Sequence, residues 1–296
     1  MTVRSAIADA CAVLKTAGID TPSLDASLLL AHVLKISRTS LAARTQEPLS
    51  QENLDEFNAL VERRQKGECT AYILGKKEFR GLEFLVGPQV LVPRPDTETL
   101  VEAAITVIKE QLAISREQAG SSDLVSANSI RVLDLCTGSG AVAVSLKNEM
   151  PFLDVYASDI SDGALEIAEK NAQRLLGENQ IHFYSGDLYD ALSRSLFSLI
   201  VSNPPYIPAD EIKTLSAEVQ NEPRLALDGG KTGLEIISRI IDRTPDFLKR
   251  GGFLLLEADP RQMEKIASGL AGKGFYDIKL FKDLSGRERV IGGMFE

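Results

Sequence analysis

Apolar residues recur at helical spacing in the first 75 residues of the chain. Gly18 is placed to end a first helix, Thr21-Pro22 to open a second, and Ser50 to cap a third. The apolar face of the first helix is formed by Val3, Ile7, Ala10, Cys11 and Leu14. The pattern predicts a small helical bundle over residues 1–75, which we interpret as a domain that docks a partner.

The period of the apolar pattern changes to two in the next segment. Apolar side chains alternate on both sides of Arg80-Gly81, which predicts a β-hairpin linker over residues 76–95. Asp96 is expected to cap the helix that follows. The polar stretch 115–129 is expected to be a flexible loop.

From Ile130 onward, apolar strands alternate with amphipathic helices. Helices are expected to start near residues 140, 161, 232 and 260. Strands are expected at 130–135, 153–158, 180–184, 197–202, 252–258, 275–281 and 288–293. Such alternation is typical of an α/β fold with a doubly wound, mainly parallel sheet, and we assign residues 96–296 to it.

Length and composition fit one large α/β domain and one small helical domain. The 296 residues are 44% hydrophobic and 25% charged, which is ordinary for a soluble globular protein. No apolar stretch approaches the length of a bilayer span and no signal-peptide core is visible, so we expect a cytoplasmic protein without a membrane partner. Three cysteines without a CxxC pair and only two histidines argue against a disulfide framework, a metal site and a histidine-based hydrolase.

The charge balance argues against a nucleic-acid partner. The net charge is −9 and the pI is about 5.0. Residues 1–75 carry 8 basic and 9 acidic side chains, and residues 130–296 carry 19 and 25, so neither has the basic excess that phosphate neutralisation requires. Because charge can be segregated locally, this balance weakens a nucleic-acid substrate without excluding it.

A glycine-containing turn between the first strand of the sheet and its helix is the first candidate site. Glycine lets the backbone approach a ligand closely, and a helix N-terminus offers free N–H donors. In an open α/β sheet this turn lies at the topological switch point, where nucleotides bind. By itself such a feature is often only a turn. The candidate cofactor-binding residues here are Asp134, Cys136, Thr137, Gly138, Ser139 and Gly140.

Two acidic residues favour an adenosine ligand. Asp159 ends the next strand, where a carboxylate can accept hydrogen bonds from both ribose hydroxyls. Asp187 follows the third strand, where it can accept from the exocyclic amine of an adenine. Since the glycine spacing departs from the dinucleotide GxGxxG fingerprint, S-adenosylmethionine is favoured over a nicotinamide cofactor.

The most specific short motif is Asn203-Pro204-Pro205-Tyr206, at the carboxyl end of the fourth strand. Two consecutive prolines produce a rigid, extended loop and leave its carbonyls free of local competition. A stiff turn would explain the two prolines alone. Asn before them and Tyr after them, at the sheet edge where ligands bind, favour a functional loop.

This tetrad resembles that of methyltransferases that modify planar amide or amino nitrogens: glutamine N5, adenine N6 and cytosine N4. Followed by Ile207-Pro208, it is similar to the HemK/PrmC family, the release factor glutamine methyltransferases. Further segments similar to that family are Tyr72-Ile73-Leu74-Gly75, Leu91-Val92-Pro93-Arg94-Pro95-Asp96-Thr97-Glu98, Glu222-Pro223-Arg224-Leu225-Ala226-Leu227-Asp228-Gly229-Gly230 and Asp283-Leu284-Ser285-Gly286-Arg287-Glu288-Arg289. The resemblance therefore covers essentially the whole chain.

The resemblance implies a seven-stranded Rossmann-like methyltransferase sheet, with S-adenosylmethionine as cofactor. It implies that the substrates are class I peptide-chain release factors, whose Gly-Gly-Gln tip carries the target glutamine, so that methylation modulates translation termination.

In this interpretation the catalytic residues are Asn203, Pro204 and Tyr206, which also bind the substrate together with Pro205. The Asn203 side-chain oxygen and the Pro204 carbonyl would each accept one hydrogen of the glutamine NH2 and aim its nitrogen at the sulfonium methyl. Tyr206 would pack beside the flat amide. Asn203 would also contact the cofactor.

Three residues depart from the family pattern. Cys136 stands where the family usually has a glycine, and a small side chain should be tolerable there. Leu188, a further predicted cofactor-binding residue, replaces an aromatic residue that commonly packs on the adenine. Thr232 occupies a position that is often acidic.

Three rival functions remain open at this point. A nucleic-acid adenine or cytosine methyltransferase shares the tetrad chemistry, but the net acidity and the absence of a basic target-recognition region disfavour it. A non-catalytic adaptor that keeps the fold is disfavoured by the complete tetrad and by Asp159. A nicotinamide oxidoreductase is the least favoured.

Overall fold

The computed structural model describes residues 1–119, 130–193 and 195–296, and the chain divides into two compact units. The first unit comprises Met1–Lys76 and Ser216–Asn221, and the second comprises Lys77–Leu215 and Glu222–Glu296. Each unit has its own apolar core. Within the described ranges, no helix has both the length and the apolar character needed to cross a membrane.

The N-terminal unit is helical, as the sequence predicts. Pro22 is the first residue of α2, and Ser50 caps α4 by accepting from the N–H of Asn53. The short helices α3 and α5 were not predicted, because six and five residues are too few to show a helical period. The helices of this unit are α1 (Val3–Thr16), α2 (Pro22–Val33), α3 (Arg38–Ala43), α4 (Gln51–Gln65), α5 (Thr70–Leu74) and α9 (Ala217–Gln220).

Arg64 on α4 joins distant parts of this unit. The residue is 2% exposed, and its guanidinium donates to Asp25 Oδ2 at 2.8 Å and to Glu218 Oε2 at 3.0 Å. Glu218 belongs to α9. The segment Ser216–Asn221 is therefore held in the N-terminal unit, although both of its chain neighbours belong to the second unit.

The predicted β-hairpin is present. Strands β1 (Lys76–Phe79) and β2 (Leu82–Leu85) pair across Arg80-Gly81, whose φ values of 50° and 74° suit a two-residue type I′ turn. Phe79 and Phe84 pack edge to face, with ring centroids 6.0 Å apart, in the core of the second unit.

Two details of the next helix were predicted wrongly. A 3-10 turn, η1 (Pro95–Thr97), precedes α6 (Glu98–Ala119), and the carboxylate of Asp96 pairs with Arg289 at 3.0 Å instead of capping the helix. Proline supplies the first turn with its fixed φ, so no side-chain cap is needed. Residues 115–119 are helical, since Arg, Glu, Gln and Ala are good helix formers. The rest of the predicted loop, 120–129, lies outside the described residues.

A seven-stranded sheet forms the middle layer of the second unit, with the strand order β5-β4-β3-β6-β7-β9-β8. The first five strands in this order, from β5 through β4, β3 and β6 to β7, pair in parallel, whereas β9 is antiparallel to both β7 and β8. This confirms the predicted doubly wound, mainly parallel sheet. Its strands are β3 (Arg131–Leu135), β4 (Asp154–Asp159), β5 (Ile181–Ser185), β6 (Phe197–Ser202), β7 (Leu248–Glu257), β8 (Phe275–Lys282) and β9 (Glu288–Phe295).

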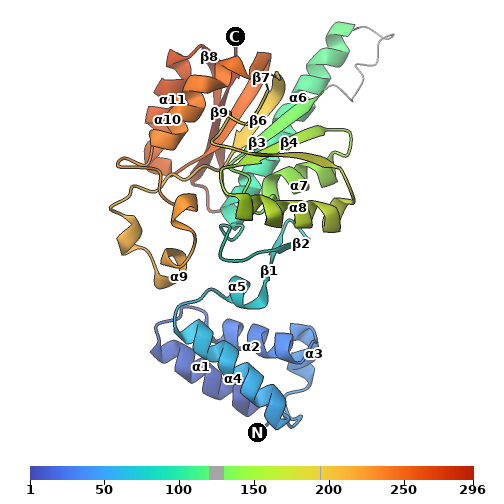
Figure 1. Cartoon of the computed structure of the whole chain (residues 1–296), viewed down its shortest axis with the longest axis vertical. Coiled ribbons are helices and arrows are strands. Elements are labelled where there is room, and N and C mark those ends of the chain that lie inside the picture. The colour runs from blue at the N-terminus through green and yellow to red at the C-terminus, as the bar shows by residue number, and fades with distance from the viewer. Residues whose placement is uncertain (120–129, 194) are drawn as a thin grey trace. The chain divides into compact units, whose positions relative to one another are not determined.

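Helices cover both faces of this sheet (Figure 1). Helices α6, α7 (Ala141–Glu149) and α8 (Asp162–Leu176) pack on one face, and α10 (Glu235–Arg243) and α11 (Met263–Gly272) pack on the other. Successive residues of a strand point to opposite faces, so neighbouring residues of β3 enter different cores.

Strand β3 pairs with β4 on one side and with β6 on the other, so the strand order reverses direction here. In open α/β sheets, ligands bind beyond the carboxyl ends of the strands at such a switch point. Both candidate motifs, the turn after β3 and the tetrad after β6, are at this place.

Candidate active site

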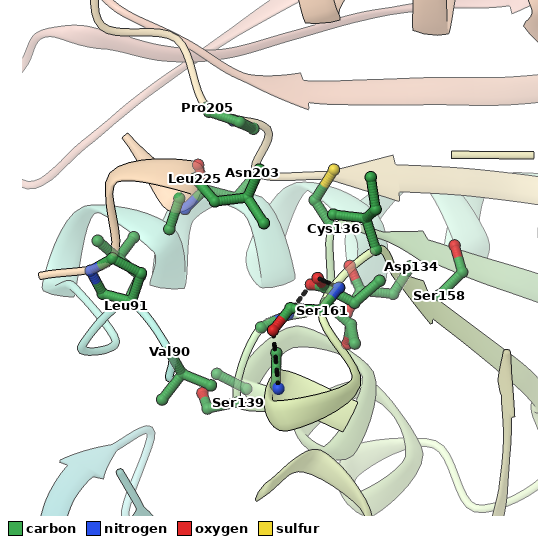
Figure 2. A pocket seen from close by; sticks show the side chains of 18 of the residues that line it. Val90, Leu91, Asp134, Cys136, Ser139, Ser158, Ser161, Asn203, Pro205 and Leu225 are labelled. Atoms are coloured by element: carbon green, nitrogen blue, oxygen red, sulfur yellow. Dashed lines mark hydrogen bonds between the residues drawn. The ribbon is translucent and has the colours of Figure 1, made fainter. Parts of the chain in front are cut away.

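A cavity of about 280 Å³ opens at the carboxyl ends of the parallel strands (Figure 2). The loops after β3, β4, β5 and β6 each supply part of its wall. The predicted site residues that line the cavity are Asp134, Cys136, Thr137, Gly138, Ser139, Asp159, Asp187, Leu188, Asn203 and Pro205. The structure therefore brings both motifs and both acidic residues together around one space.

Asp134 holds the turn after β3. Its Oδ2 accepts from Thr137 Oγ1 at 2.6 Å and from the N–H of Ala143 at 3.2 Å. Burial raises the pKa of this carboxyl to about 7. The two hydrogen bonds oppose the rise in pKa, and the nearby charge of Asp159 adds to it.

Cys136 and Gly140 have different roles in this turn. Cys136 has φ of 59°, the left-handed region that favours glycine, and burial raises the pKa of its thiol, so the group stays neutral. Gly140, also predicted to bind the cofactor, is not among the lining residues. A Cβ at Gly140 would lie 3.2 Å from the Cβ of Ala168, so this glycine lets α7 and α8 approach closely.

Asp159 connects two loops of the wall. Its Oδ2 accepts from the N–H of Gly138 and its Oδ1 from the N–H of Ser161, both at 2.9 Å. Burial raises the pKa of Asp159, and these backbone hydrogen bonds oppose the rise. A carboxylate has about four acceptor positions, so Asp159 can accept further hydrogen bonds on the cavity side.

Asp187 and Leu188 follow β5. Asp187 Oδ2 accepts from Nη2 of Arg239 on α10 at 2.6 Å, and both side chains line the cavity. Leu188 is 6% exposed, and its carbonyl accepts from Ser158 Oγ at 3.3 Å. This part of the wall therefore places a carboxylate beside an apolar, non-aromatic surface.

Asn203 is the polar residue of the tetrad in the cavity wall. Its Nδ2 donates to Thr97 Oγ1 at 3.1 Å, which leaves Oδ1 as the acceptor of the carboxamide. Figure 2 shows Asn203 and Pro205 together in the wall. Pro204 and Tyr206 are not among the lining residues, and the Tyr206 hydroxyl donates to Glu257 Oε1 at 3.4 Å.

The glycine loop after η5 (Arg224–Ala226) supports the tetrad backbone. The N–H of Gly229 donates to the carbonyl of Ile207 at 2.9 Å. A Cβ at Gly229 would lie 2.7 Å from the Pro205 carbonyl oxygen, and one at Gly233 only 2.3 Å from the Tyr206 carbonyl oxygen. Only glycine lets the two loops pack this closely.

Thr232, in the same loop, helps to begin α10. Its N–H and its hydroxyl donate to the carboxylate of Glu235 at 3.0 and 3.1 Å. Thr232, which stands where the family often has an acidic residue, therefore makes a local contact that stabilises the start of α10.

Sequence reasoning missed the part of the wall that precedes α6. Leu91, Arg94 and Thr97 line the cavity, yet no strand end marks this segment in the sequence. Arg94 pairs with the buried carboxylate of Glu222, which also accepts from the N–H of Val92 at 3.1 Å. A lone glutamate before a proline gives no sequence signal of such a long-range contact.

Comparison with known proteins finds relatives over nearly the whole chain. Residues 5–75 match the family described as PrmC N-terminal domain, and residues 121–227 match the methyltransferase small domain. The release factor glutamine methyltransferase of Coxiella burnetii is 41% identical, covering 92% of this chain and 91% of that protein. The enzymes of the same name from Geobacter sulfurreducens and Escherichia coli are 37% and 36% identical, each over 93% of this chain and over 90% and 93% of their own lengths.

Among solved structures, the hMettl16 catalytic domain in complex with MAT2A 3'UTR hairpin 1 has a similar fold. The TM-score is 0.56 at 15% identity, covering 86% of this chain and 85% of that chain. At this identity the likeness shows a shared methyltransferase fold and nothing more.

Proposed function

We propose, since the chain belongs to the release factor glutamine methyltransferase family, that it methylates N5 of the Gly-Gly-Gln glutamine in class I peptide-chain release factors. One observation carries the proposal beyond family membership. Asn203 places a carboxamide in the cavity wall with its Nδ2 engaged by Thr97, so Oδ1 is the group that can accept from a substrate amide.

S-adenosylmethionine is the cofactor that we assign to the cavity, where it would supply the electrophilic methyl group. The donor and acceptor set fits it. The carboxylate of Asp159 would accept from the ribose hydroxyls, and Asp187, with one oxygen on Arg239, would accept from the adenine amine through the other. Leu188 and Val90 add apolar surface for a flat ring. A cytoplasmic location stays a prediction.

The proposed chemistry depends on hydrogen-bond acceptors. An amide nitrogen is a weak nucleophile because its lone pair is delocalised into the carbonyl. Oδ1 of Asn203 and the carbonyl of Pro204 would each accept one hydrogen of the substrate NH2, and both bonds strengthen as positive charge develops on nitrogen. The proton can leave after the methyl transfer, so no strong base is required. Since the Tyr206 hydroxyl faces Glu257, we assign Tyr206 to holding the loop.

The test is intact-mass analysis of purified release factors after incubation with the enzyme and S-adenosylmethionine. We expect the mass of one methyl group, located by fragmentation at the Gly-Gly-Gln glutamine, and no gain when that glutamine is replaced by glutamate. DNA and RNA are offered in parallel with radiolabelled cofactor. Label on nucleic acid and none on protein would support the rival amino-methyltransferase function instead.

A further inference from the structure

A buried carboxylate lies behind the tetrad and takes no part in the chemistry above. Glu257 ends β7 and is 1% exposed. Its Oε1 accepts from Tyr206 Oη at 3.4 Å, whereas Oε2 has no partner in full hydrogen-bond geometry among the residues that the structure describes. Because a buried acceptor without a donor is costly, this oxygen requires a nearby proton.

Thr97 has a proton to give. Its hydroxyl accepts from Asn203 Nδ2, and Thr97 is 4% exposed, so its own hydrogen is left for a second, nearby acceptor. Glu257 is the group that it affects. Burial raises the pKa of Glu257 to about 7, and the hydrogen bond from Thr97 is the largest of the effects that oppose this rise. The positive charge of Arg289 opposes the rise as well.

We propose that Glu257 and Thr97 are positioning residues for methyl transfer, which set the orientation of the Asn203 carboxamide. In its ionised form Glu257 can only accept, so the Thr97 proton is directed to it. Thr97 can then only accept from Asn203, and Oδ1 of Asn203 faces the cavity. With the carboxamide turned over, Oδ1 would face an oxygen without a proton, and an NH2 group would face the NH2 of the substrate.

The same carboxylate reaches both ends of the tetrad. Tyr206 donates to it directly, and Thr97, whose hydrogen bond acts against the rise of its pKa, links it to Asn203. A buried polar network favours one arrangement over its alternatives more strongly than a solvent-exposed one does. The inference rests on the proposed function in one respect only: the group that Asn203 serves is an amide nitrogen.

The first test compares Thr97→Val, which removes the hydroxyl at nearly constant shape, with Thr97→Ser, which keeps it. In single-turnover methyl transfer, Thr97→Val is expected to lower the rate ~10- to 100-fold, as for loss of a preorganised polar contact. Thr97→Ser is expected to keep most of the parental rate. The KM for the release factor and the affinity for S-adenosylhomocysteine should change little. Equal rates for Val and Ser would overturn the proposal.

A double-mutant cycle separates positioning from direct contact, since Thr97 also lines the cavity. If Thr97 acts through Asn203, then Thr97→Val should add almost nothing in an Asn203→Ala background. Effects that multiply would mean that Thr97 acts on the cofactor or the substrate itself, and the proposal would be wrong.

A third measurement does not depend on any substrate. The side-chain NH2 signal of Asn203, identified by its absence in Asn203→Ala, is followed by NMR in the free protein. We expect its shift and hydrogen exchange to change in Thr97→Val and in Glu257→Gln, and to be retained in Thr97→Ser. An unchanged signal in Thr97→Val contradicts the inference even if release factors are methylated. If no release factor is methylated by the parent enzyme, the proposed function fails while this measurement still decides the inference.

Discussion

The carboxamide of Asn203 is held before any substrate arrives. Strand β6 ends one residue earlier, at the sheet edge, and Pro204 and Pro205 restrict the loop that follows. Thr97 then engages the amide nitrogen. An acceptor that is oriented during folding needs no reorganisation during the reaction, which is where preorganised polar groups lower an activation barrier.

Replacing Asn203 should therefore slow the chemical step more than it weakens cofactor binding. We expect Asn203→Ala to lower single-turnover methyl transfer on the order of a hundredfold or more, whereas Asn203→Asp, which keeps an acceptor oxygen, should retain measurable activity. Asn148→Ala, at an exposed position on α7, is the matched control. A parental single-turnover rate in Asn203→Ala would remove the amide clamp from the mechanism.

Asp159 joins two loops of the cavity wall, and we propose that it also binds the ribose of the cofactor. Asp159→Ala should weaken S-adenosylhomocysteine binding roughly 10- to 100-fold, because a charged acceptor for two hydroxyls is lost. Since the carboxylate also accepts from Gly138 and Ser161, Asp159→Asn is expected to preserve part of the affinity. Calorimetry is the measurement, with Glu169→Ala on the exposed face of α8 as control. An unchanged affinity in Asp159→Ala would exclude this residue from the site.

At the scale of elements, the packing of two loops controls the tetrad. Gly233 has φ of 76°, and an added Cβ would meet the Tyr206 carbonyl oxygen at 2.3 Å. Gly233→Ala should destabilise the fold by roughly 2–4 kcal/mol and lower methyl transfer, because the tetrad backbone must move. Gly272→Ala, where no atom lies within 4 Å of the added Cβ, should be neutral or stabilising. Denaturant melts and single-turnover assays are made on both variants. If Gly233→Ala is as stable and as active as Gly272→Ala, the close approach of Gly233 to Tyr206 does not control the tetrad.

The turn after β3 should make the stability of the ligand-free protein depend on pH. Burial raises the pKa of Asp134 from 3.8 to about 7, so the folded state holds this proton more tightly than the unfolded state does. The contribution of Asp134 to stability therefore falls as the pH rises from about 4 to 7.

Asp134→Asn removes this titration and keeps the shape of the side chain. Relative to the parent, the variant should gain stability across that interval, by an amount on the order of 2–4 kcal/mol at pH 8. Urea melts at several pH values measure it. A stability difference between variant and parent that does not change with pH would contradict the raised pKa of Asp134.

Helices and strands could be predicted where a periodic pattern extends over many residues, and site residues where their motif is local in the sequence. Alternating strands and helices after Ile130 implied the sheet, and the tetrad and Asp159 were placed at its edge. Thr97 and Glu257 were not recognised, because their contact with the tetrad joins segments far apart in the sequence. Tyr206 was expected to pack beside the substrate amide, which stays a prediction, and the bond from its hydroxyl to Glu257 was not foreseen. An aromatic side chain in the loop after a strand does not reveal which way its hydroxyl points.

At the scale of the whole molecule, the chain passes from the second unit into the N-terminal unit and back again between Leu215 and Glu222. After Leu215 the chain supplies α9 to the N-terminal unit, where Glu218 pairs with Arg64 and Asn221 Nδ2 donates to the Gly67 carbonyl at 3.0 Å. It then returns at Glu222, and the residues that follow line the cavity. Removing the N-terminal unit therefore also removes the partners of this segment.

Deleting residues 1–75 should preserve cofactor binding and strongly reduce methylation of the folded release factor. The two apolar cores of the second unit begin at Phe79, so they remain intact, and we expect the affinity for S-adenosylhomocysteine to change less than about tenfold. If the N-terminal unit docks the substrate, as we propose, kcat/KM for the intact release factor should fall far more than the rate on a short Gly-Gly-Gln peptide.

A full-length variant separates loss of docking from loss of the α9 contacts. Glu218→Ala combined with Asn221→Ala removes the ties to Arg64 and Gly67 but keeps the N-terminal unit, and Arg64 still pairs with Asp25. If docking is the function of the N-terminal unit, this variant should methylate the release factor at close to the parental kcat/KM while the truncated chain does not. If both are equally impaired, the unit acts by holding the segment Ser216–Asn221, after which the chain continues into cavity-lining residues. If the truncated chain methylates the intact factor at full efficiency, neither role holds.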